Sequence, residues 1–204
     1  MKLTNTTLLS SERLATLFAE QVDGWPHRAL TVRVRYSRGR EFSGTCDYTA
    51  KAIYINLGRQ VQYPYDIYTH IARAKSNATH WWKPIYRVRV ADAYGLALYV
   101  FCHELYHWLV KQARRNTRQK ESMCDRFATR VLVDHYGAGV FDESGRPAPR
   151  SDWDFQDLDG FVARARRMTQ AELAAVRKAK AACRPRAQDK FPADHSGQPL
   201  LFPL

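Results

Sequence analysis

The stretch 93–110 constrains the fold more than any other part of this 204-residue chain, because its residues are apolar on nearly every side of a helix. Asp92 can cap its start, and its length favours a helix over a strand. A helix that is apolar all round is buried in a core. Three ionisable residues interrupt it: His103, Glu104 and His107. Burying them is costly unless a metal ion or a hydrogen-bond network holds them, so the core must contain a polar centre.

These three residues belong to the motif HELYH at positions 103–107. Residues four apart share one face of a helix, so His103 and His107 can bind the same ion. Two histidines at this spacing favour Zn²⁺, and Glu104 then reaches the water on the metal as a general base. The alternative is a pair of core histidines satisfied by hydrogen bonds. We expect the metal site, with one zinc ion per chain.

A catalytic zinc site needs a third protein ligand, and the chain offers two acidic candidates. Glu121 and Asp125 lie four residues apart in a second predicted helix, which begins at Asn116 or Thr117 and runs through Tyr136. If the two helices are antiparallel, Glu121 can coordinate the metal while Asp125 accepts the outer N–H of a histidine. The reverse assignment stays open, as does an ordinary exposed role for Glu121.

The cysteines suggest neither a disulfide framework nor a thiolate metal site. Cys46, Cys102, Cys124 and Cys183 include no CxxC spacing, so we expect reduced thiols. Cys102 and Cys124 flank the proposed ligands. Too few thiols converge there for cysteine ligation, and we expect both to be ordinary buried side chains.

The segments HELYH and ESMCDRFA together resemble the HExxH…ExxxD pattern of gluzincin metallopeptidases. The second segment is similar to the E-x-x-A-[ND]-x-F-A segment of the ImmA/IrrE family. An expected strand at 52–56, after a turn at 44–46, resembles the layout of SprT-like proteases, in which this strand lines the cleft and pairs with extended substrate. The likeness spans about residues 28–137, within which the stretch 59–91 reads as an insertion.

This resemblance implies a zinc-dependent endopeptidase. His103, His107 and Glu121 would hold Zn²⁺, and Glu104 would accept a proton as zinc-bound water attacks a peptide carbonyl. Two alternatives stay open. One is a regulatory protease of the ImmA/IrrE kind that cleaves a repressor, and the other is a DNA-binding adaptor that keeps the scaffold without catalysis.

The order of elements predicts an α+β fold, specifically a minimal gluzincin-like zincin domain. A small mixed sheet would pack on the HELYH helix and on the helix that carries Glu121. The domain would span 1–183, with its core at 28–137 and C-terminal helices at 151–183, before a flexible tail at 184–204. Periodicity further predicts a helix from Ser10 or Ser11 to Val22, strands at 31–36, 51–57 and 85–90, a short helix at 63–76 and a loop at 80–84.

The charge balance suggests an acidic partner. The chain has 32 Lys and Arg against 20 Asp and Glu, a net charge of +12 that is spread along its length. We expect DNA to be that partner, and the alternative is a basic surface that only keeps the protein in solution. The candidate nucleic-acid-binding residues are Arg33, Arg35, Trp81, Trp82, Arg87, Arg89, Arg114, Arg115 and Arg118.

The C-terminal segment contains a candidate docking motif for a protein partner. Its sequence QPLLF resembles the peptide by which bacterial proteins bind the sliding clamp, with Gln198, Leu201 and Phe202 as the contact residues. The alternative is an apolar end that packs on the domain. No stretch predicts a signal peptide or a membrane span, so we expect a cytoplasmic protein.

Overall fold

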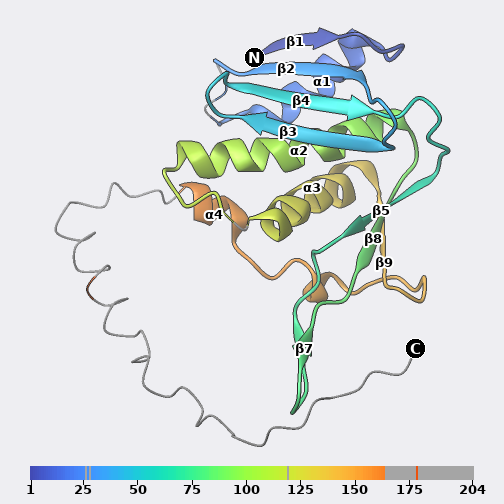
Figure 1. Cartoon of the computed structure of the whole chain (residues 1–204), viewed down its shortest axis with the longest axis vertical. Coiled ribbons are helices and arrows are strands. Elements are labelled where there is room, and N and C mark those ends of the chain that lie inside the picture. Colours follow the sequence, from blue (N-terminus) through green and yellow to red (C-terminus); the bar gives the residue numbers. More distant parts are fainter. Residues whose placement is uncertain (26, 28, 119, 164–177, 179–204) are drawn as a thin grey trace, which may run out of the picture. The chain divides into compact units, whose positions relative to one another are not determined.

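The helix α2 (Ala93–Gln112) lies at the centre of the fold in the computed structural model (Figure 1). The side chain of Asp92 caps it by accepting a hydrogen bond of 2.8 Å from the backbone N–H of Gly95. Most apolar side chains of α2 are buried, and Phe101 and Leu105 are completely so. The predicted position and burial of this helix are therefore confirmed.

A four-stranded mixed sheet covers one side of α2 (Figure 1). Its strands, in spatial order, are β1 (Lys2–Asn5), β2 (Thr31–Tyr36), β4 (Ala52–Leu57) and β3 (Phe42–Asp47). The first three are parallel and β3 is antiparallel. Val32 and Ile55 point inward and are buried. The helix α1 (Ser11–Val22) packs beside α2 through the stacked rings of Phe18 and Phe101, which are 4.3 Å apart.

The strand β3 forms the edge of this sheet and lies against the HELYH segment. Two expectations are corrected here, since residues 44–46 belong to a strand rather than a turn, and β4 is an interior strand. Gly44 explains the close approach: a Cβ there would stand 2.8 Å from both Cγ of Glu104 and Cγ1 of Val100. Only glycine lets the strand lie this near the helix. The edge strand beside the motif is therefore β3.

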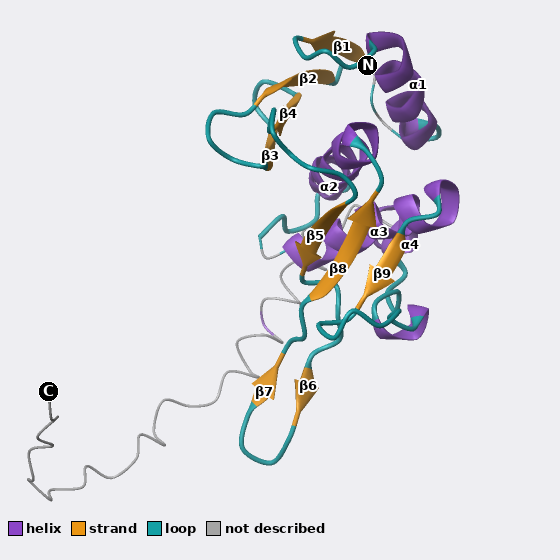
Figure 2. Ribbon diagram, turned by 90° about the vertical axis from the view of Figure 1, so that its right-hand side faces the viewer, coloured by secondary structure: helices purple, strands orange, loops and turns teal. Residues whose placement is uncertain are grey.

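The stretch 59–91 forms a second sheet and a projecting hairpin (Figure 2). The sheet contains β5 (Tyr65–Thr69), β8 (Tyr86–Val90) and β9 (Gly139–Phe141), and the hairpin contains β6 (Lys75–Ser76) and β7 (Trp81–Trp82). The strand predicted at 85–90 is confirmed and the helix predicted at 63–76 is wrong. The loop predicted at 80–84 holds except at Trp81–Trp82, which form β7. Antiparallel pairing of β5 with β8, which buries Ile67 and Thr69, overrides the local helical pattern.

The helix α3 (Glu121–Tyr136) runs back along α2 and completes the core (Figure 1). It ends at Gly137, whose φ of 64° is the left-handed conformation that commonly terminates helices. It begins later than the predicted Asn116 or Thr117, because residues 113–118 and Lys120 lie outside both helices, in the turn between them. The sequence therefore located α3 and its end, but not its start.

The structure describes residues 1–25, 27, 29–118, 120–163 and 178. Contacts divide the chain into Met1–Ala165 and Arg166–Leu204. In place of the long helix expected from 151, the described part has a 3₁₀ turn η1 (Arg150–Asp152) and a short helix α4 (Leu158–Ala163). No helix in these described ranges is long and apolar enough to cross a membrane. The rest of the predicted C-terminal helices, apart from residue 178, and the docking peptide with Gln198, Leu201 and Phe202 lie outside the described residues.

Candidate metal centre

The two facing helices bring His103, His107 and Glu121 together. The two histidines lie on one face of α2, with ring centroids 5.1 Å apart. Across from them, Oε2 of Glu121 is 3.2 Å from Nε2 of His103, and Oε1 is 3.3 Å from Nε2 of His107. Both Nε2 atoms therefore face one carboxylate, and the three side chains have the donor types that zinc prefers.

Asp125 lies one turn further along α3 and orients this group. Its Oδ1 accepts hydrogen bonds of 2.9 Å from Nδ1–H of His103 and from the hydroxyl of Tyr99. Its Oδ2 accepts the backbone N–H of His70 at 3.2 Å. These bonds hold the His103 ring with Nε2 toward Glu121. The contacts therefore favour Asp125 in the orienting role and Glu121 as the carboxylate presented to a metal.

A thiol also converges on the histidines. Ring nitrogens of His103 and His107 and the Sγ of Cys124 all lie within 4.8 Å of one another, so this group could hold a metal ion. Cysteine spacing did not indicate this group, because the other donors beside Cys124 are the histidines of α2 and not further thiols. Two donor sets thus share the histidines. The shorter distances to Nε2 favour Glu121 as the third ligand, although Cys124 is the more deeply buried of the two.

The charges of the centre depend on one another. Burial acts to lower the pKa of His103, but hydrogen bonds to Asp125 and Glu121 outweigh it and raise the pKa to about 10. The bond with His103 is also the main reason that the pKa of Glu121 is lowered to about 2. Burial, then the charge of His103, lowers the pKa of His107. Protons and a metal compete for the same ring nitrogens, so the centre is suited to a cation that replaces the proton.

Glu104 is buried beside β3, with only 7% of its surface exposed. Burial is the main cause that raises its pKa to about 7, and the charge of Glu121 adds to it. The charge of His103 and a hydrogen bond from the backbone of Cys46 partly offset this rise. A carboxyl group with a pKa near neutrality can both accept and return a proton. This environment supports the expected role of Glu104 as a base.

A small cavity of about 120 Å³ opens beside His103 and Glu104. Phe42 and Gly44 of β3 and Tyr68 of β5 contribute to its walls. Tyr68 is 70% exposed, and it was missed because its segment was expected to be helical. The available signal was composition, since four of the five residues in YDIYT are aromatic or β-branched types that favour strands. The cavity therefore joins the metal centre to both sheets.

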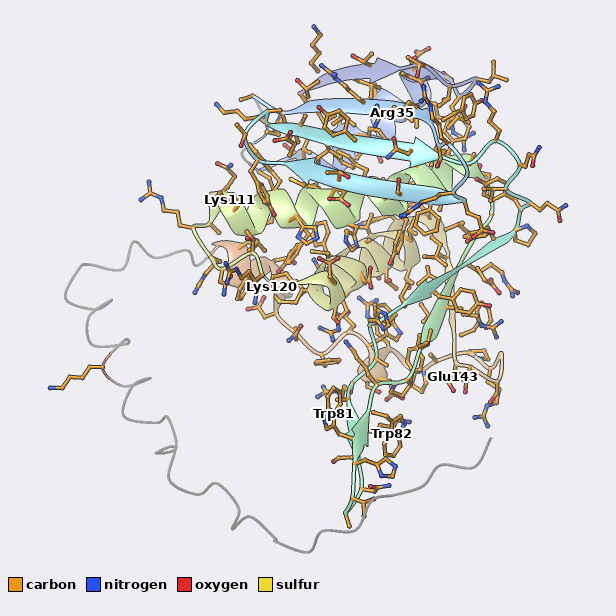
Figure 3. All side chains as sticks on the ribbon, in the orientation of Figure 1. Arg35, Trp81, Trp82, Lys111, Lys120 and Glu143 are labelled. Atoms are coloured by element: carbon orange, nitrogen blue, oxygen red, sulfur yellow. The ribbon has the colours of Figure 1, made fainter. Side chains whose placement is uncertain are left out.

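The four strand arginines do not share one solvated face. Arg33 and Arg35 lie on the exposed outer side of β2, where Figure 3 shows the second of them. Arg87 and Arg89 belong to the other sheet, and Asp66 pairs with them at 3.5 Å and 2.7 Å. These candidate nucleic-acid-binding residues therefore belong to two separate sheets, and the second pair has a carboxylate partner.

The remaining nucleic-acid candidates lie on two projecting segments. Trp81 and Trp82 are on the hairpin, with 73% and 43% of their surfaces exposed (Figure 3). Arg114, Arg115 and Arg118 are exposed in the turn between α2 and α3. The turn immediately precedes Glu121 in the sequence, so its arginines are close in the chain to the metal centre. The hairpin instead projects from the second sheet.

No protein-family model matches the chain, and neither a curated protein nor a solved structure matches it. The resemblance to gluzincins rests on the residues of α2 and α3.

The orienting role of Asp125 makes a testable prediction. Asp125→Asn removes the charge that fixes the His103 ring, so zinc affinity should fall by about 10–100-fold in competition with a chromogenic chelator. Asp134→Asn is the matched control, because Asp134 lies on the same helix but pairs with Arg150. Equal zinc affinity in the Asp125 variant and the wild type would contradict the assignment.

Proposed function

We propose that the protein is a zinc-dependent endopeptidase with a gluzincin-like zincin domain, in which His103, His107 and Glu121 hold one zinc ion. The observation that carries this proposal is the convergence of both Nε2 atoms on the Glu121 carboxylate. The buried Glu104, next to the first ligand in the chain, supports it. So does the mixed sheet, whose antiparallel edge strand lies along the motif helix.

The chemistry follows from where Glu104 lies. When bound, a zinc ion would polarise a peptide carbonyl and bring the pKa of a water molecule toward about 7. Glu104 accepts the proton of the attacking water and delivers it to the leaving amine. The backbone N–H of Cys46 and the wall of β3 hold its carboxyl group in place. The hydrogen bond to Asp125 keeps the ring of His103 in one orientation during both proton transfers.

The edge strand β3 favours an extended polypeptide as substrate. An extended segment can add to a sheet edge through main-chain hydrogen bonds, which do not depend on its side chains. The cavity beside Glu104, lined in part by Phe42 and Tyr68, can then take one side chain. Such a site acts on flexible segments of proteins more readily than on folded domains.

The base role of Glu104 is tested by Glu104→Gln. This variant should keep its zinc but lose proteolysis of an unfolded protein by about 10²–10⁴-fold, because the amide cannot accept the proton. Glu12→Gln is the control, since Glu12 is an exposed carboxylate in the first turn of α1. Full proteolysis by a zinc-loaded Glu104→Gln preparation would rule out this mechanism.

A second candidate function, binding of single-stranded DNA, is favoured by the exposed tryptophans of the hairpin. Large exposed aromatic rings are uncommon on a surface without a partner. The exposed Lys75 pairs with Trp82 across the hairpin, and Lys83, which follows Trp82 in the chain, donates a hydrogen bond to Ser122 of α3. Aromatic rings among cations are the combination that stacks bases and attracts phosphates. We propose that this hairpin recruits the peptidase to proteins on DNA.

Replacing both tryptophans by alanine should weaken binding of single-stranded DNA in fluorescence anisotropy, because each stacked base contributes about 1–3 kcal/mol. Replacing them by phenylalanine should keep most of the affinity, and Leu8→Ala, at another exposed apolar residue, should keep all of it. Unchanged affinity in the alanine variant would exclude the hairpin as the binding surface.

Two other outcomes would favour the alternative functions. Cleavage of a single repressor without DNA binding would favour a regulatory protease of the ImmA/IrrE kind, and DNA binding without cleavage would favour a non-catalytic adaptor.

A further inference from the structure

The proposed reaction makes no use of Cys124, although this residue lies at the metal centre. It is three residues after Glu121 in α3, so both side chains are on the same face of that helix. It is completely buried, and its Sγ lies within 4.8 Å of ring nitrogens of both His103 and His107. Two donors from α2 and two from α3 therefore face each other across a small space.

The separation of these atoms fits metal ligation with little movement. Bonds of about 2.0–2.1 Å to nitrogen and 2.3 Å to sulfur place the ligand atoms of a tetrahedral zinc site roughly 3.5 Å apart. The upper limit of 4.8 Å leaves about 1 Å for the side chains to close on the ion. Cys102 provides the contrast, since it is also completely buried but stands outside the group. Burial alone therefore does not place a thiol beside the histidines. Cys124 lies there because of its position on α3.

We propose that the thiolate of Cys124 is a fourth protein ligand, beside His103, His107 and Glu121, and that it keeps the peptidase latent. Four protein ligands make a closed site of the structural type, whereas a catalytic site keeps one position for water or substrate. The thiolate and water therefore compete for the same position, and departure of the thiolate from the metal opens the site. Ligation by Cys124 requires a bound metal ion but no peptidase activity. Latency, in contrast, rests on the proposed peptidase function.

Substitution with Co²⁺ tests the ligation directly. The wild-type protein with one bound Co²⁺ should show the intense near-ultraviolet thiolate-to-cobalt charge-transfer band. Cys124→Ser and Cys124→Ala should bind Co²⁺ without this band, and Cys102→Ala should retain it. Cobalt bound to the wild type with no charge-transfer band overturns the proposal, as does a band that survives in Cys124→Ser. Serine has nearly the size of cysteine, so this variant keeps the test valid if the alanine variant unfolds.

Latency is tested by proteolysis with zinc-loaded protein. Cys124→Ala should cleave an unfolded protein at least about tenfold faster than the wild type, because its fourth position is open to water. Slower cleavage by a metal-loaded Cys124→Ala overturns latency. A charge-transfer band without proteolysis in either protein refutes the peptidase function and the latency that rests on it, while ligation stands. Proteolysis without a band refutes the ligation and the latency that needs it, while the peptidase function stands.

Discussion

Compensation for buried charge is the constraint on which the rest of this structure depends. The helix α2 places His103, Glu104 and His107 in a core that offers them little water. The helix α3 supplies Glu121 and Asp125, whose carboxylates lie within hydrogen-bonding distance of the histidine rings. The antiparallel course of α3 places these two carboxylates opposite the histidines and so meets this need.

The edge strand completes the centre from the other side. Gly44 allows β3 to lie against Glu104, and the backbone of Cys46 donates to its carboxyl group. One strand thus positions the proposed base and offers the sheet edge to which an extended substrate would add. The second sheet contributes Tyr68, and His70, directly after β5, contributes its backbone N–H, so the stretch that resembles an insertion is part of the centre.

Reasoning from the sequence succeeded where local pattern decides the outcome. The continuous apolar run predicted α2, and the four-residue spacing of Glu121 and Asp125 placed both on the face of α3 that meets the histidines. It failed where tertiary pairing decides, as in β5, whose helical pattern yields to pairing with β8. Proximity across elements was equally hidden. The approach of Cys124 to the histidines and the pairing of Asp66 with Arg87 and Arg89 depend on contacts that no spacing encodes.

The proposed function depends on binding of a metal ion by His103 and His107. Elemental analysis of the purified wild-type protein by plasma mass spectrometry tests it most directly, with a variant in which His103 and His107 are both alanine as the reference. We expect about one zinc ion per wild-type chain and almost none in the variant, because a site formed on folding retains its metal. Less than about 0.2 zinc per wild-type chain after purification without chelators, with no uptake of added zinc, would contradict it.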